Sequence, residues 1–166
     1  MDIVAAFIAG TTWILLCLFR VLSIKFLWWF LIGFVIGSVW EWVHFAVPDF
    51  IQFTNTTTTK SLAIKILSVI AHSIWDSFIL IIAALLVLGL KIKLKSVCAL
   101  MMMIVFCVAQ EIIVELIFNG RVWVYNDQNK ANPILFHIGR VNYTLWPILE
   151  WLLAPILFWT IVIHLP

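Results

Sequence analysis

The chain has 166 residues, of which 65% are hydrophobic and 11% charged, and its mean hydropathy is +1.16. A soluble globular domain is about half apolar and about a quarter charged, so this composition excludes that class and indicates an integral membrane protein. The length suits one domain over residues 1–166. The formal net charge of +2 says little by itself, and we expect no nucleic-acid partner.

Five apolar segments follow one another along the chain. A membrane-crossing helix needs about 20 predominantly apolar residues. The sequence predicts such helices at about residues 3–19, 26–47, 66–90, 96–118 and 143–165. The fourth stops at the helix-ending pair Asn119–Gly120, and we expect Pro147 and Pro155 to kink the fifth. The expected fold is therefore an all-α, multi-pass integral membrane bundle of about five transmembrane helices.

Two longer connections separate these helices. Residues 49–60 form a polar loop with an Asn-Thr-Thr glycosylation sequon at Asn55, and residues 119–142 are apolar enough to lie on the membrane surface. The short connections at residues 20–25 and 91–95 are basic and contain no acid. The positive-inside rule then slightly favours an N-terminus outside and a C-terminus inside.

The most informative feature is the position of the acidic residues. Every Lys and Arg lies at a helix end or in a connection, whereas five of the eight acids fall inside the predicted helices. An acid at the bilayer centre costs at least about 2.5 kcal/mol, so each must be protonated, paired with a histidine, bound to a metal or exposed to water. The five are Glu41, Asp76, Glu111, Glu115 and Glu150.

Helix geometry places these acids at a common depth. At about 1.5 Å per residue, Glu41 and Glu111 lie about 20 Å from the inner face, while Asp76 and Glu150 lie about 15 and about 10 Å from the outer face. Helical spacing also pairs side chains on one face: Glu41 with His44, His72 with Asp76, Glu111 with Glu115, and Trp146 with Glu150. The sequence therefore predicts a shared acidic cavity in the outer half of the membrane.

Such a cavity suits proton-driven chemistry on a hydrophobic lipid within the membrane. A buried, protonated carboxyl group can protonate an alkene, and a second group can remove a proton elsewhere, which isomerises or cyclises the lipid without a cofactor. We expect Glu41 or Asp76 to be the donor and His72 or Glu111 the acceptor. The full expected catalytic set is Glu41, His72, Asp76, Glu111, Glu115 and Glu150.

Aromatic side chains accompany the acids. Aromatic faces stabilise a carbocation by cation–π attraction, and Trp40, Trp75 and Trp146 each lie within one helical turn of an acid. Trp28, Trp29 and Trp159 instead fit the interfacial belt of a membrane protein. The expected substrate-binding residues are Trp40, His44, Trp75, Gln110, Asn142 and Trp146.

Two other functions stay open. Glu41-x-x-His44 has the spacing of a carboxylate-bridged di-metal site, which would make the protein a membrane oxidoreductase. That site needs two such pairs and the chain has one, so we expect neither a metal nor another cofactor. Intramembrane acids also serve proton or ion paths and small subunits of larger complexes, which leaves a homo-oligomer or partner membrane subunits open.

The last two apolar segments resemble the emopamil-binding-protein (EXPERA) family of sterol isomerases, a five-helix membrane fold. Gln110 and Glu115 match a Gln and an acid five residues apart in that family's fourth span. Pro133 matches a loop proline, with Asn132 where the family has His. Asn142 and Trp146 are similar to its Asn-x-x-Trp motif, but three residues separate them.

Two further segments are similar to known acidic motifs. His72-x-x-x-Asp76 resembles the family's catalytic His-x-x-x-Glu, although it lies in the third span and not in the second. "GSVWEW" with Glu41 and "WDSFIL" with Asp76 resemble acidic segments of the integral membrane terpene cyclases of meroterpenoid pathways. Both families protonate an isoprenoid alkene, so the resemblance implies a sterol-like or isoprenoid substrate.

Overall fold

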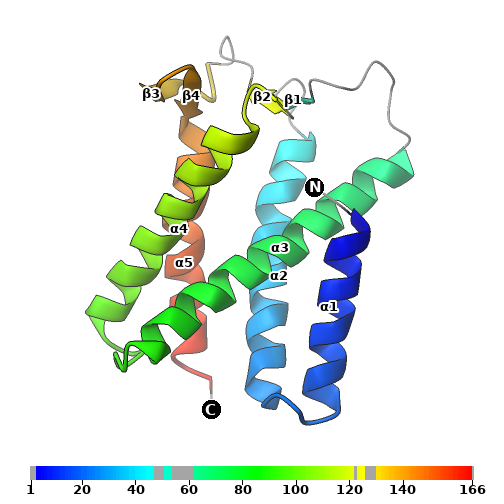
Figure 1. The fold of residues 1–166 in the computed structure, drawn as a ribbon, viewed down its shortest axis with the longest axis vertical. Helices are drawn as coiled ribbons and strands as arrows, with labels where there is room; N and C mark the ends of the chain where they lie inside the picture. The colour runs from blue at the N-terminus through cyan, green and yellow to red at the C-terminus, as the bar shows by residue number, and fades with distance from the viewer. Residues whose placement is uncertain (1–2, 47–50, 54–61, 122, 126–129, 166) are drawn as a thin grey trace.

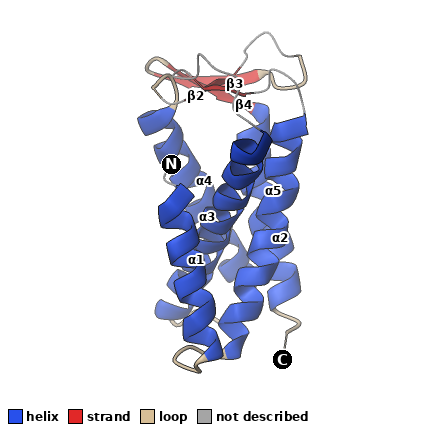
Figure 2. Ribbon diagram, turned by 90° about the vertical axis from the view of Figure 1, so that its right-hand side faces the viewer, coloured by secondary structure: helices blue, strands red, loops and turns tan. Residues whose placement is uncertain are grey.

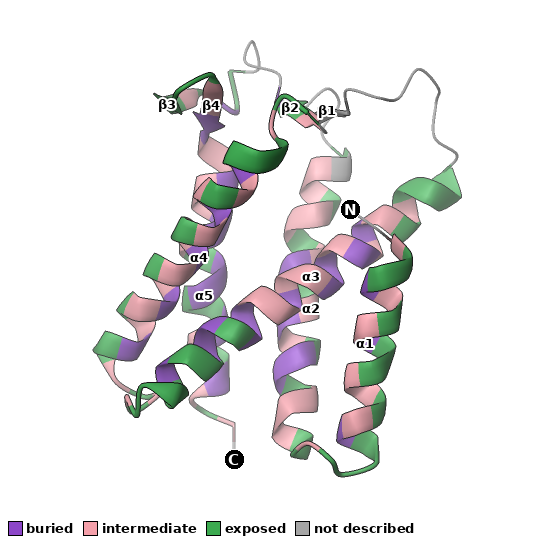
Figure 3. Cartoon of the chain, viewed as in Figure 1, coloured by how far each residue is buried: buried purple, intermediate pink, exposed green. Residues whose placement is uncertain are grey.

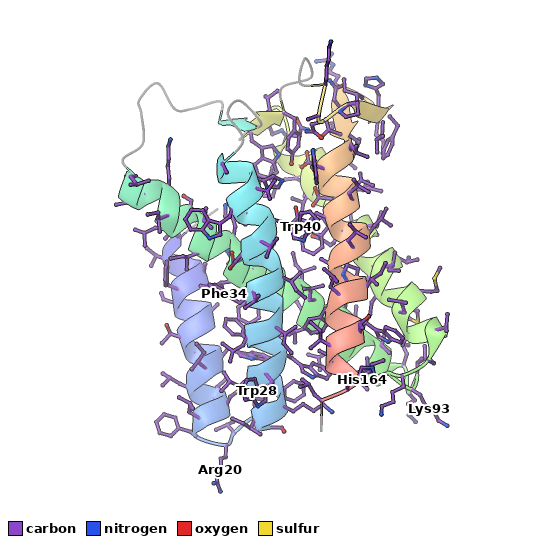
Figure 4. The ribbon with its side chains drawn as sticks, turned by 180° about the vertical axis from the view of Figure 1, so that it is seen from behind. Arg20, Trp28, Phe34, Trp40, Lys93 and His164 are labelled. Carbon is purple, nitrogen blue, oxygen red and sulfur yellow. The ribbon has the colours of Figure 1, made fainter. Side chains whose placement is uncertain are left out.

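A computed structural model describes residues 3–46, 51–53, 62–121, 123–125 and 130–165. These residues form the helices α1 (Ile3–Leu18), α2 (Ile24–Ala46), α3 (Leu62–Gly89), α4 (Val97–Phe118) and α5 (Leu145–Val162). The helices run alternately up and down the long axis of the molecule (Figure 1). The prediction of an all-α bundle is confirmed. The end that carries the α1–α2 and α3–α4 connections, with Arg20 and Lys93, is called the loop end (Figure 4). The opposite end, where the strands lie, is called the strand end.

Four helices are long and apolar enough to cross a membrane, namely Ile24–His44, Leu62–Gly89, Val97–Phe118 and Leu145–Val162. The helix α1 is apolar but has 16 residues, about 24 Å at the usual helical rise. The limits of α1, α2 and α4 lie within two residues of the predicted ones, whereas α3 begins four residues earlier than predicted, at Leu62. The helix α5 begins at Leu145 and not at residue 143, because residues 141–144 form a strand, and it ends at Val162. Pro147 therefore sits in the first turn of α5, where it costs no intrahelical hydrogen bond, and Pro155 lies inside the helix.

Small residues let α3 cross closely over α2, and α3 runs diagonally through the bundle (Figure 1). A Cβ atom at Gly33 would lie 2.9 Å from the Cα atom of Ser77, so only glycine fits there. The Ser77 hydroxyl donates hydrogen bonds to the Phe30 carbonyl at 3.1 Å and the Ser73 carbonyl at 3.0 Å. Gly33-x-x-x-Gly37 is thus the small-residue contact typical of packed membrane helices.

The loop half of the bundle has an apolar core. Buried residues alternate with exposed ones along each helix (Figure 3). Leu80, Ala84 and Val87 of α3 pack with Phe158 and Val162 of α5. Trp29 belongs to this core with 1% of its surface exposed, and its ring meets those of Phe26 and Phe158 edge-on. Trp29 is therefore a core residue, whereas Trp28 is 54% exposed, and the interfacial position predicted for both stays a prediction.

Two short antiparallel sheets cover the strand end (Figure 2). The strand β1 (Ile51–Phe53) pairs with β2 (Trp123–Tyr125), and β3 (Ile134–Ile138) pairs with β4 (Val141–Thr144). The β1–β2 pair joins the α2–α3 connection to the α4–α5 connection, and so links the helices α2 and α4 at the strand end. The segment expected to lie on the membrane surface therefore contains three strands, and the sequon at Asn55 lies outside the described residues.

Candidate functional site: a buried cluster of carboxyl groups

Glu41 and His44 share one face of α2, yet each faces a different helix. The Glu41 Oε2 atom lies 3.3 Å from Nδ1 of His72 on α3. The His44 Nε2 atom lies 3.9 Å from Oε2 of Glu150 on α5. These side chains are between 7% and 28% exposed. The face of α2 that carries an acid and a histidine thus links α2 to α3 and α5 through two carboxyl–imidazole contacts.

Asp76 lies directly against α2 at Gly37. A Cβ atom at position 37 would be 2.7 Å from Asp76 Oδ2, so the missing side chain of Gly37 makes the space for the carboxyl group. The Oδ2 atom is buried and has no hydrogen-bond partner among the described residues. The Asp76 carboxyl group also lies close enough to Glu41 for a direct electrostatic interaction. Asp76 is therefore a buried acid beside the Glu41–His72 pair, and its Oδ2 atom accepts no hydrogen bond from the described residues.

Glu150 and Glu111 extend the cluster to α5 and α4. Both are buried, with 5% and 6% of their surfaces exposed. Glu150 interacts electrostatically with Asp76, Glu41 and Glu111. Glu111 is hydrogen-bonded to Trp151 and to Glu115, one turn further along α4. A hydrogen bond between two carboxyl groups requires that one of them carries a proton.

Glu115 is the member of the cluster that is hydrogen-bonded to the strand β2. Its Oε1 atom accepts hydrogen bonds from the Tyr125 hydroxyl at 2.8 Å and the Trp123 ring nitrogen at 3.3 Å. Its Oε2 atom accepts one from the Asn119 side-chain amide at 2.8 Å. Burial raises the pKa of Tyr125 well above its usual range, and the neighbouring Glu115 charge adds to this, so Tyr125 keeps its proton and stays a donor. Glu115 is thus fully hydrogen-bonded, unlike Asp76.

The sequence reasoning missed the three donors to Glu115. Trp123 and Tyr125 alternate in "VWVY", so a strand would place both side chains on one face. That alternation was the available signal, but three residues are too few to distinguish a strand from a loop. Asn119, expected only to end a helix, does end α4 and also uses its side chain on Glu115.

The tryptophans expected to stabilise a cation lie on three of the helices that carry the carboxyl groups. Trp40 lies between α2 and α5 (Figure 4), and its ring centroid is 6.3 Å from that of Trp146. Trp75 lies beside Phe78, with centroids 6.1 Å apart, and its buried ring nitrogen has no acceptor in the described part of the chain. The Trp146 backbone N–H donates to the Asn132 side chain at 2.9 Å, which positions the start of α5.

The two remaining predicted residues lie apart from the carboxyl groups. Asn142 is on β4, where its Oδ1 atom lies 2.8 Å from Nδ1 of the exposed His137. Its backbone carbonyl accepts a hydrogen bond from Asn119 at 3.1 Å, so within the described residues Asn142 is connected to the cluster through Asn119 and Glu115. The side-chain nitrogen of Gln110 is buried and has no acceptor within the described ranges.

The di-metal hypothesis gains no support from this geometry. Glu41 and His44 turn to different helices, so they do not converge on one point. Within the described residues, no group of three or more His, Cys, Asp or Glu side chains has an arrangement that could hold a metal ion.

No family model matches the chain, and neither a curated protein nor a solved structure is significantly similar to it. The fold and the site together define an apolar helical bundle with carboxyl groups from four helices gathered in its strand half. The resemblance to sterol isomerases therefore stays a hypothesis carried by the residues named above.

Proposed function

We propose that this protein is a multi-pass integral membrane enzyme that isomerises or cyclises a sterol-like or isoprenoid lipid by proton transfer. The observation that carries this proposal is the position of Asp76, a buried acid with a free oxygen, beside the Glu41–His72 pair. A proton donor and a proton acceptor within one apolar site are what alkene isomerisation needs.

In the proposed reaction the product has the same molecular formula as the lipid substrate. The O–H bond of Asp76 breaks, and its proton adds to one alkene carbon, which leaves a carbocation at the other. The Glu41–His72 pair then removes a proton from a neighbouring carbon, and the electrons of that C–H bond form the new double bond. In a cyclisation, a second double bond attacks the cation before the proton leaves. No oxidant or cofactor takes part.

The surroundings favour this chemistry over hydrolysis or phosphate transfer. Every Lys and Arg in the chain lies at a helix end or in a connection, so no fixed cation competes for the carboxyl groups. The Trp40–Trp146 pair joins α2 and α5, two of the helices that carry the carboxyl groups, and an aromatic face stabilises a nearby cation by about 0.5–2 kcal/mol. An apolar bundle also keeps water from trapping the cation.

A proton path is the second candidate, because the carboxyl groups form a continuous series from Asp76 through Glu150 and Glu111 to Glu115. The series leads from Asp76 toward the strand end and does not continue toward the loop end. Residues 77–89, 97–110 and 151–162 contain no Asp, Glu, His, Lys or Arg, so α3, α4 and α5 carry none of these groups from the cluster to the loop end. A path that ends halfway suits an internal reaction site better than conduction across a membrane.

The test begins with native mass spectrometry of the gently solubilised protein to identify any bound lipid. The protein is then incubated in lipid nanodiscs with that lipid, or with a panel of sterols and linear isoprenoids, in heavy water. We expect an isomeric product of the same formula that has gained deuterium, and its loss in Asp76→Asn. The control is His137→Ala on the exposed hairpin. Full turnover by both Asp76→Asn and Glu41→Gln would refute the proposal.

A further inference from the structure

Glu115 lies one hydrogen bond away from a surface pocket at the strand end. This pocket, of about 130 Å³, is lined by Asn119, Gly120, Val124, Tyr125, Arg140 and Asn142. Two of its lining residues, Asn119 and Tyr125, donate hydrogen bonds to the Glu115 carboxyl group. A single layer of side chains therefore separates this surface pocket from a carboxyl group that is 2% exposed.

On its other side, Glu115 is hydrogen-bonded to Glu111. Glu111 interacts with Glu150, and Glu150 interacts with Asp76. The groups thus follow one another from the pocket to the middle of α3, and each neighbour in the series is a proton donor or acceptor.

We propose that Tyr125 and Glu115 form a proton-exchange path between this pocket and the buried carboxyl groups. A hydronium ion in the pocket gives a proton to the Tyr125 oxygen and becomes water as the hydroxyl proton passes to Glu115. One O–H bond thus forms and one breaks at the Tyr125 oxygen, and one O–H bond forms at Glu115. Glu115 passes a proton to Glu111 in the same way, and the reverse sequence returns one to water. Tyr125 never ionises in this exchange, which agrees with the raised pKa of its hydroxyl group.

The path rests on the proposed function and deepens it, because it supplies solvent protons to the carboxyl groups besides the proton that the Glu41–His72 pair removes from the lipid. The apolar core around Leu80, Val87 and Phe158 blocks the approach from the loop end, so the strand end is where protons enter. The β1–β2 pair then has a second role besides joining two connections, because β2 carries the first relay group.

The experiment uses the full chain in nanodiscs and needs no substrate. The C=O stretching band of protonated carboxyl groups moves to lower frequency when O–H becomes O–D, so infrared spectra after transfer to heavy water report the exchange rate. We expect Tyr125→Phe and Glu115→Gln to slow the exchange of the remaining carboxyl groups by about tenfold or more. Tyr143→Phe is the matched control, because the Tyr143 hydroxyl, on β4 of the other sheet, donates to the Ile112 carbonyl at 2.9 Å and not to Glu115.

The outcomes separate the path from the enzyme. Exchange at the parental rate in both variants, or equal slowing in Tyr143→Phe, overturns the path. So does a parent protein whose carboxyl band is absent or never shifts. Circular dichroism identifies a variant that has lost its helices, and the other variant then decides the result. Slowed exchange in a protein that converts no lipid would keep the path and refute the proposed function.

Discussion

Gly37 on α2 provides the space for the carboxyl group of Asp76 on α3. The two residues come from different helices, and a Cβ atom at position 37 would lie 2.7 Å from Oδ2 and 2.8 Å from Cβ of Asp76. Real side chains do not approach so closely, so the glycine is required by the acid. The contact ties the crossing of α2 and α3 to the residue that the proposed reaction uses as its donor.

Gly37→Ala should therefore damage both stability and activity. The added methyl group must push α3 away or turn Asp76 out of its position, and such overpacking costs about 1–3 kcal/mol. Thermal unfolding in detergent measures the loss. Gly89→Ala is the matched control, because a Cβ atom there meets nothing within 4 Å. A Gly37→Ala protein as stable as the control would show that the crossing adapts freely.

Asp76→Asn should give the opposite combination, with activity lost and the bundle intact. The Oδ2 atom has no hydrogen-bond partner in the described part of the chain, so the substitution breaks no hydrogen bond there and removes a buried ionisable group. We expect a change in unfolding free energy within about 1 kcal/mol, measured by denaturant titration. Destabilisation by several kcal/mol would instead assign Asp76 a structural role.

The helices and the depth of the acids could be predicted because each depends on local patterns. Apolar runs of about 20 residues define the helices, and a fixed rise per residue places Glu41, Asp76 and Glu150 at similar heights. Which side chains contact one another across helices could not be predicted in this way. Glu41 and His44 share a face, but whether each turns to α3 or α5 depends on the tilt of α3, which no local pattern specifies.

Two other features show where sequence reasoning stopped. The β1–β2 pair joins Ile51 to Tyr125, two short segments far apart in the chain, so neither segment signals a strand by itself. The Gly33-x-x-x-Gly37 spacing, by contrast, was readable as a helix-packing motif. With it, the contact between α2 and α3 beside Asp76 could have been anticipated.

Glu41 and His72 should act as one unit in the proposed reaction. Glu41→Gln keeps the shape of the side chain but cannot accept a proton as the carboxylate does, and general-base loss typically costs about 10²–10⁴ in rate. We expect His72→Gln to cost less, and the double variant to be no slower than Glu41→Gln, because the contact at 3.3 Å makes the two effects non-additive. Turnover rates of the three variants form the double-mutant cycle. Losses that simply multiply would show that the two groups act separately.

Tyr125 should make stability depend on pH in alkaline solution. Its pKa is raised in the folded protein by burial and by Glu115, whereas an exposed tyrosine in the unfolded chain has a pKa of about 10. The folded state thus holds the proton more tightly, so this contribution is complete below about pH 10 and is lost as the pH rises toward the folded pKa.

Tyr125→Phe isolates that contribution. At neutral pH the variant leaves Glu115 with one donor fewer and should lose about 1.5–3 kcal/mol, the usual value of a hydrogen bond to a charged group. The difference in unfolding free energy between parent and variant, measured by denaturant titration from neutral to alkaline pH, should shrink as the pH rises. A difference that stays constant across this range would mean that the hydroxyl proton of Tyr125 is held no more tightly in the folded protein than in the unfolded chain.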